Sequence, residues 1–164
     1  LVLMDIGAEF ACYSADVTRT VPVNGRFTPR QREIYSAVLA AQEAAIREIR
    51  PGVRFARVHE TAFREVGAAL KRLGLIQGES ETGKYFLHGT SHGLGLDVHD
   101  PMPADTLAPG MVITVEPGIY IPEESLGVRI EDDVLVTENG SRVLSESLPR
   151  QIEEIEAIMA AREF

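Results

Sequence analysis

Histidines and carboxylates gather on strand-like segments between residues 88 and 133, and this clustering constrains the fold more than any other feature of the chain. Three of the four histidines lie there, in the segments His88-Gly-Thr-Ser-His92 and Asp97-Val-His99-Asp100. Two acidic motifs on apolar flanks follow them, Val-Ile-Thr-Val-Glu116-Pro-Gly and Gly-Val-Arg129-Ile-Glu131. Imidazole nitrogens and carboxylate oxygens suit borderline to hard divalent cations. The pattern therefore predicts strands that meet around a metal site, with further ligands elsewhere in the chain.

The overall composition narrows the class of protein. A chain of 164 residues, 45% hydrophobic and 25% charged, can bury one core and is globular. The formal net charge of -9 argues against a nucleic-acid partner, because phosphate binding needs clustered Lys and Arg. Cys12 is the single cysteine, so no intrachain disulfide can form and a reducing, cytoplasmic compartment is expected. No apolar run approaches the ~18 residues of a membrane span, so no membrane association is expected.

The chain opens directly on an apolar strand pattern, Leu1-Val-Leu-Met-Asp5, with no initiator Met and no turn before it. We therefore expect residues 1–164 to be a fragment whose missing N-terminal part supplies neighbouring strands or helices.

Residues 1–23 are typical of a β-hairpin that turns near residues 10 and 11. In that hairpin Asp5 and Asp16 would sit opposite each other, close enough to share a cation. Two ionised carboxylates at such a distance repel each other unless a positive charge lies between them. Alternatively, both residues only mark the ends of turns.

Two helices are expected next. The segment Thr28-Pro29-Arg-Gln31 is typical of a helix start with a capping box, and helical apolar spacing continues until Pro51. A second helix is expected over residues 55–73. His59 lies on it among charged neighbours, so we interpret it as a surface residue without a role.

The rest of the chain alternates loops and strands. Residues 77–84 and 101–109 are expected to be loops, and residues 85–88 and 111–116 strands. Gly93-Leu-Gly95 lacks the full spacing of a nucleotide-binding motif, and we expect these glycines to let backbone pass close to a crowded site.

Glu116 and Glu131 belong to a second expected hairpin, which would place the two carboxylates across from each other. Residues 138–140 are expected to form a tight turn after this hairpin, and a final helix is expected from Pro149. Asp5, Asp16, His92, Glu116 and Glu131 are thus five candidate ligands. Two divalent cations would balance the four carboxylates, whereas one would leave a buried excess of negative charge.

These motifs resemble those of the pita-bread metallopeptidases, the superfamily of aminopeptidase P, prolidase and methionine aminopeptidase. The segments that carry the resemblance are Asp5, Asp16-Val-Thr-Arg-Thr, His88-Gly-Thr-Ser-His92, Leu96-Asp-Val-His-Asp100, Val115-Glu-Pro-Gly-Ile-Tyr120 and Gly127-Val-Arg-Ile-Glu-Asp-Asp133. Leu-Asp-Val-His-Asp favours aminopeptidase P, the Xaa-Pro aminopeptidase, because dipeptidases more often have Glu around that histidine. The resemblance runs from Leu1 to about Ile158.

The resemblance implies an α+β fold, with a curved antiparallel sheet flanked by helices. Residues 1–164 would be the C-terminal part of the metallopeptidase catalytic domain, without its N-terminal segment and N-terminal domain. It also implies two divalent ions, usually Mn(II) and sometimes Co(II) or Zn(II). The implied metal ligands are Asp5, Asp16, His92, Glu116 and Glu131.

The resemblance assigns further roles around the metals. Glu116 would act as general base, and His88 and His99 would hydrogen-bond the substrate carbonyl. Alternatively, the two histidines only satisfy buried polar groups. Arg129 resembles an arginine near the substrate, or else it neutralises the acids of the site. Tyr13 and Tyr120 would be pocket walls or core.

The implied activity is release of the N-terminal residue from peptides with proline second, by a longer protein that is a homo-oligomer, a dimer or tetramer. The family has a further histidine in the segment before Leu1, so the fragment alone could be inactive. Alternatives are an Xaa-Pro dipeptidase (prolidase), a catalytically silent module that binds peptides or proteins, and creatinase-like hydrolysis of a non-peptide C–N bond. The filled ligand positions disfavour the last two.

Overall fold

The computed structural model describes residues 1–102 and 104–161. Its elements are, in chain order, β1 (Val2–Ile6), β2 (Glu9–Phe10), β3 (Tyr13–Ser14), β4 (Val17–Val21), α1 (Pro29–Glu48), α2 (Ala56–Arg72), η1 (Glu79–Lys84), β5 (Val112–Val115), β6 (Gly118–Ile121), η2 (Pro122–Glu124), β7 (Leu126–Arg129), β8 (Asp132–Val136), β9 (Ser141–Val143) and α3 (Ile152–Ala160). The strand pairs among these residues are antiparallel. This is the expected α+β class.

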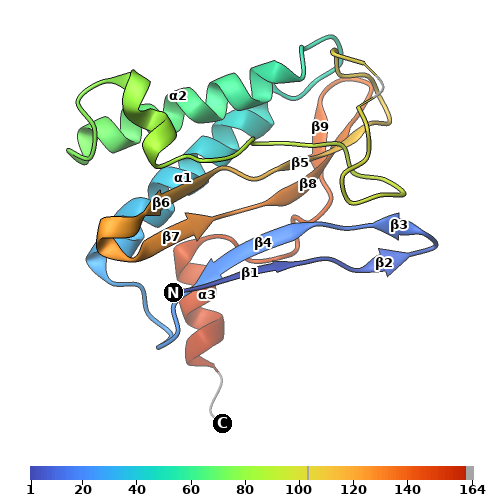
Figure 1. The fold of residues 1–164 in the computed structure, drawn as a ribbon. Helices are drawn as coiled ribbons and strands as arrows, with labels where there is room; N and C mark the ends of the chain where they lie inside the picture. Colours follow the sequence, from blue (N-terminus) through green and yellow to red (C-terminus); the bar gives the residue numbers. More distant parts are fainter. Residues whose placement is uncertain (103, 162–164) are drawn as a thin grey trace.

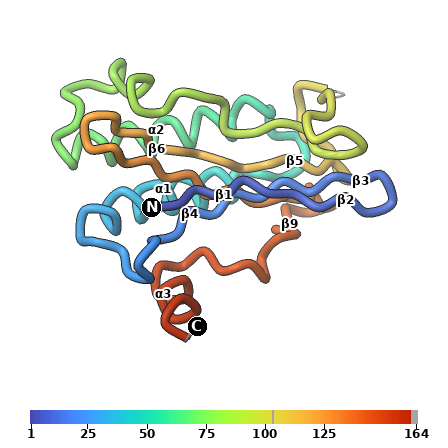
Figure 2. The backbone as a smooth tube through the Cα atoms, turned by 60° about the horizontal axis from the view of Figure 1, so that its bottom comes forward, coloured from blue at the N-terminus to red at the C-terminus, as the bar shows by residue number. Residues whose placement is uncertain are grey.

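Helices α1 and α2 pack against each other beside the strands, and α3 meets the beginning of α1, where Arg32 pairs with Glu153 and Glu156 (Figures 1 and 2). The capping box expected at the start of α1 is present: the Gln31 backbone N–H donates to the Thr28 hydroxyl, and the Thr28 N–H donates to the Gln31 side chain. The apolar stripes of both helices are buried in one core with the inner residues of the strands. None of the described helices combines the length and the hydropathy that crossing a membrane requires.

The N-terminal hairpin is formed by β1 with β4 and by β2 with β3, the blue ribbons of Figure 1. Its turn lies at Ala11 and Cys12, which both have positive φ, as a two-residue hairpin turn with the twist of its strands requires. The expected turn near residues 10 and 11 is therefore displaced, and Asp5 pairs with Thr18 instead of Asp16. Because residues two apart in a strand share a face, Asp5 and Asp16 are diagonal neighbours on one face.

The second hairpin is confirmed. Val115 pairs with Asp132 on one side of the acidic positions, and Gly118 pairs with Arg129 on the other, in the same register. Glu116 and Glu131 therefore oppose each other between the two ladders. The tight turn at residues 137–140 joins β8 to β9, and the Thr137 N–H donates to the Gly140 carbonyl over 2.9 Å.

Several local expectations were wrong. Residues 79–84, expected as part of a loop, form the short helix η1, and the last helix begins at Ile152 instead of Pro149. Residues 85–88 form no strand. The Tyr120 N–H donates to the Tyr85 carbonyl, but this one backbone hydrogen bond to β6 does not make a strand ladder. The expected loop at residues 101–109 is irregular where it is described, and residue 103 lies outside the described residues.

A buried polar cluster locks the strands together beside the acidic positions. The Asp132 carboxylate is fully buried and accepts hydrogen bonds from Arg19 (2.7 Å), Arg150 (2.8 Å), Ser145 (2.6 Å) and Gln42 (3.0 Å). The Arg19 guanidinium also donates to the backbone carbonyl of Glu131 over 2.6 Å. Side chains alternate along a strand, so this arrangement turns the Glu131 carboxylate toward the other face.

Candidate metal centre

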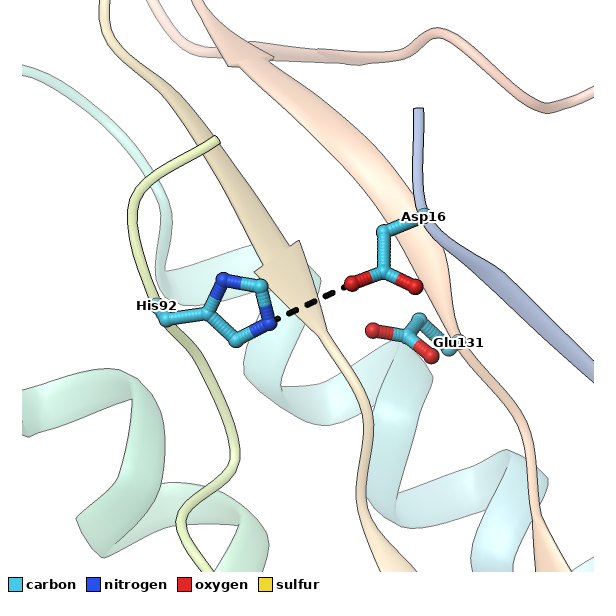
Figure 3. Close-up of side chains that lie close together, drawn as sticks. All are labelled: Asp16, His92 and Glu131. Carbon is cyan, nitrogen blue, oxygen red and sulfur yellow. Dashed lines mark ion pairs between the residues drawn. The ribbon is translucent and has the colours of Figure 1, made fainter. Parts of the chain in front are cut away.

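Three side chains from distant parts of the chain point toward one another in Figure 3: Asp16, His92 and Glu131. Asp16 immediately precedes β4, His92 lies in the loop before β5, and Glu131 lies between β7 and β8. One ligand atom of each lies within 4.8 Å of the others, and the His92 Nε2 is 3.5 Å from an Asp16 oxygen. The strand pairing thus brings together the donors that the sequence left scattered.

The protonation of His92 fits a metal ligand. Its Nδ1 lies 3.0 Å from the Gly93 carbonyl oxygen, which can only accept, so Nδ1 carries a hydrogen. In the neutral ring the Nε2 lone pair then faces the oxygens of Asp16 at 3.5 Å and Glu116 at 3.4 Å. A lone pair cannot bond to a carboxylate oxygen, so a proton or a cation must lie between them. Metal-ligating histidines usually donate their other N–H to a carbonyl or carboxylate in this way.

Glu116 links the metal-ligand group to the other histidines. Its two oxygens lie 3.4 Å from the His92 Nε2 and 3.8 Å from the His88 Nδ1. Burial is the main reason why the pKa of Glu116 is raised to about 7; the charge of Arg129 lowers this pKa, and the charges of Asp16 and Asp5 add to the rise. The carboxyl group can therefore take up and release a proton near neutral pH.

The acids of the site repel one another in a poorly solvated place. Glu131 is 2% exposed, and burial, followed by the charges of Glu116 and Asp16, raises its pKa to about 8, against the hydrogen bond from Thr18. Burial and the neighbouring Asp5 also raise the pKa of Asp16. A divalent cation would reverse this effect, because it favours the ionised carboxylates. The donor set of carboxylate oxygens and one imidazole nitrogen therefore fits such an ion.

Asp5 stands apart from the three-residue group. Its carboxylate is half exposed and forms an ion pair of 2.5 Å with the Arg129 guanidinium, which also donates to the Thr18 hydroxyl over 2.9 Å. Thr18 in turn donates to Glu131 over 2.5 Å. In this structure Arg129 therefore acts as the counter-ion of Asp5, which agrees with its interpretation as a neutralising residue. Thr18 lies in the segment Asp16-Val-Thr-Arg-Thr that carries the resemblance, but no role was expected for its side chain.

His88 and His99 border the site in different ways. The His88 Nδ1 donates to the Gly89 carbonyl over 2.7 Å, and burial lowers the pKa of the ring, so its Nε2 accepts from the Tyr120 hydroxyl over 2.7 Å. His99 is exposed, and its ring stands perpendicular to that of His92 with 4.3 Å between centroids. Tyr120 thus orients a candidate catalytic histidine, whereas Tyr13 lies exposed in the N-terminal hairpin.

The interpretation of His59 as a surface residue was wrong. Its ring is half buried, contacts Phe63 and Phe86, and hydrogen-bonds Thr90 between His88 and His92. Burial lowers the pKa of this ring. The spacing of four residues from His59 to Phe63, along the edge of the apolar stripe of α2, was the signal that could have revealed this position.

Gly93 and Gly95 confirm the expectation of close backbone passage. A Cβ atom at Gly93 would come within 2.5 Å of the Asp100 carbonyl oxygen, and one at Gly95 would collide with the Asp100 carboxylate. A cavity of about 1050 Å³ adjoins the site here and is lined by Gly93, Asp100 and Asp133. Asp16, His92 and Glu131 do not line it, so it is not the route by which a substrate would reach them.

The chain matches known proteins over most of its length. The model of metallopeptidase family M24 matches residues 1–138. The Xaa-Pro aminopeptidase 2 of Streptomyces coelicolor is 47% identical, over 98% of this chain and 39% of its own length.

Solved structures show the same relationship. The aminopeptidase PepP of Pseudomonas aeruginosa has a TM-score of 0.93 and 44% identity over 97% of this chain and 41% of its own. A zinc-substituted aminopeptidase P of Escherichia coli in complex with product has a TM-score of 0.91 and 44% identity, over 99% of this chain and 42% of its own. The chain spans about two fifths of the length of these relatives. The expected likeness to aminopeptidase P and its pita-bread fold is confirmed.

Proposed function

The chain belongs to metallopeptidase family M24, and on that premise we propose that it forms the metal-binding part of an Xaa-Pro aminopeptidase. The observation that carries the proposal is the position of the His92 Nε2 atom, which faces oxygens of Asp16 and Glu116 at 3.5 and 3.4 Å. The buried Glu131 completes the donor set. The reaction would release the first residue of a peptide whose second residue is proline.

Two divalent ions, preferably Mn(II), would be held by Asp5, Asp16, His92, Glu116 and Glu131. When bound, they would supply Lewis acidity that polarises a carbonyl and activates water. Two divalent cations would balance the four negative charges of the carboxylates. Asp5 is paired with Arg129 through its Oδ2, so its Oδ1 would supply the metal bond unless the Arg129 guanidinium gives up that ion pair.

Glu116 would be the general base. A carboxyl group with a pKa near the working pH can accept a proton from the attacking water and pass it to the leaving proline nitrogen. Burial raises the pKa of Glu116 to about 7 in the metal-free protein, and bound cations would lower it and keep the carboxylate ionised, ready to accept a proton. Its second oxygen lies toward His88, so the proton would move on the side of the site where the histidines stand.

His88 and His99 would bind the substrate carbonyl and the tetrahedral intermediate. The Tyr120 hydroxyl orients the ring of His88, whose Nδ1–H donates to the Gly89 carbonyl in this structure and would have to leave it to reach a substrate oxygen. The exposed ring of His99 stands beside that of His92. Donors placed in advance around a developing oxyanion stabilise the transition state. Arg129, next to Tyr120 and Asp5, would contact the substrate once it leaves its carboxylate partner.

The test is turnover of an Xaa-Pro tripeptide by the full-length protein with Mn(II) and with EDTA. We expect metal-dependent release of the first residue from Xaa-Pro-Yaa and far slower release from a matched Xaa-Ala-Yaa peptide. His92→Ala should abolish turnover and reduce bound metal, whereas the exposed control Glu138→Gln should not. If the protein cleaves the dipeptide Xaa-Pro but leaves the tripeptide intact, it is a dipeptidase. Absence of both bound metal and cleavage in the wild type would assign a silent peptide-binding module.

A further inference from the structure

His59 reaches from helix α2 to the loop that carries His88 and His92. Its Nδ1 lies 2.9 Å from the hydroxyl oxygen of Thr90, and Thr90 is fully buried. A buried hydroxyl without a partner is costly, so this bond favours one position of the loop against the helix.

Thr90 occupies the centre of the loop and is tied to the site on its other side as well. Its carbonyl accepts the backbone N–H of Glu116 over 2.8 Å, and the carbonyl of His92 accepts the N–H of Thr114 over 3.0 Å. The loop thus runs alongside β5. It is held by backbone bonds on the strand side and by the His59 side chain on the helix side.

Aromatic contacts extend the same support to His88. The ring of His59 lies 5.6 Å from that of Phe86, and Phe86 meets the ring of His88 edge-on at 5.4 Å. The ring of His88 also contacts that of Tyr120, with 5.4 Å between centroids. The orientation of His88 therefore depends on Phe86, which is packed against His59.

We propose that His59 is a positioning residue, which sets the rings of His88 and His92 through its hydrogen bond to Thr90 and its contact with Phe86. This inference rests on the proposed function. The hydrogen bond and ring contacts of His59 within the described residues are with Thr90, Phe63 and Phe86 and not with a candidate metal ligand, so it acts through the loop. Partners of this kind around metal ligands contribute about 10- to 100-fold to metal affinity or activity.

The experiment compares His59→Phe, Thr90→Val and the double variant in the full-length protein. Phe keeps the aromatic contacts of His59, and Val keeps the shape of Thr90, so each single change removes only the hydrogen bond. We expect each to raise the Kd for Mn(II), measured by calorimetry, by about 10-fold and to lower kcat more than it changes KM. The double variant should lose no more than one single variant, because the bond is already absent.

Thr90→Ser and Phe63→Leu are the matched controls. Thr90→Ser keeps the hydroxyl, so its Kd for Mn(II) and its kcat should remain within about threefold of the wild-type values. Phe63→Leu changes a contact of the His59 ring without touching Thr90. If His59→Phe fails to fold, the Thr90→Val and Thr90→Ser pair decides. Additive effects of the two single changes, or an unchanged Kd and kcat in folded Thr90→Val, would overturn the inference. If the proposed function is wrong, the wild-type protein itself will show neither metal binding nor turnover, which distinguishes that result from failure of this inference.

Discussion

Removing metal from the site should make the stability of the fold fall as the pH rises. Glu131 has a folded-state pKa of about 8 against an ordinary value of 4.5, because it is buried among other acids. Between these two values the folded state binds more protons than the unfolded state. The contribution of Glu131 to the stability of the fold is therefore complete below pH 4.5 and is lost as the pH rises toward 8.

The magnitude follows from the linkage between protons and folding. For Glu131, raising the pH from about 5 to about 8 should lower the free energy of unfolding by roughly 3 kcal/mol, since the carboxyl is 2% exposed and little screened. Glu116, with a pKa of about 7, should add roughly 2 kcal/mol in the same direction. Divalent ions at about 100 times their Kd should restore about 2.7 kcal/mol, most fully at high pH, where the ligands are ionised.

The assay is urea unfolding followed by circular dichroism at pH 5, 6, 7 and 8, once with EDTA and once with Mn(II). The matched variant is Glu131→Gln, which can still accept the hydrogen bond from Thr18 but cannot ionise. It should be more stable than the wild type at pH 8 without metal, and it should gain much less from Mn(II). The reasoning would be refuted if the free energy of unfolding changed equally with pH in the presence and absence of metal. It would also be refuted if the stability of the metal-free wild type did not decline above pH 5.

Three further predictions concern single side chains. Glu116→Gln should lower kcat by about 100- to 10,000-fold, as expected for loss of a general base, while bound metal measured by elemental analysis falls by less than half; retained kcat would reject that role. Asp132→Asn should cost about 3–5 kcal/mol in urea unfolding, because it leaves the buried Arg19 and the partly buried Arg150 without their anion; a change below 1 kcal/mol would contradict this. Arg129→Met should move the acidic limb of the pH–rate profile to higher pH, since the Arg129 charge lowers the pKa of Glu116; an unmoved limb would show that Glu116 does not control it.

Much of the fold could be predicted from patterns within a few residues of each other. The capping box at Thr28 and the apolar spacing after it define α1, because helix starts and stripes are local features. The opposed positions of Glu116 and Glu131 follow from pairing two strand-like segments as a hairpin. The resemblance to aminopeptidase P likewise depends on motifs that can be read in order along the chain.

The acids illustrate what local pattern leaves undecided. Glu131, Asp132 and Asp133 are consecutive and chemically alike, yet the Glu131 carboxylate joins Asp16 and His92, while Asp132 is surrounded by Arg19 and Arg150. The alternation of a strand separates their faces, but only the partners brought by other elements decide which face receives which charge.

The sequence by itself determined helices α1 and α2, the second hairpin and the identity of the residues that can bind a metal. Tertiary structure decided the diagonal placement of Asp5 and Asp16, through a turn at Ala11 and Cys12. It also decided that Arg129 pairs with Asp5, 124 residues away, and that His59 bonds Thr90, 31 residues away. Such contacts depend on how whole elements pack, and no periodicity within one element encodes the position of another.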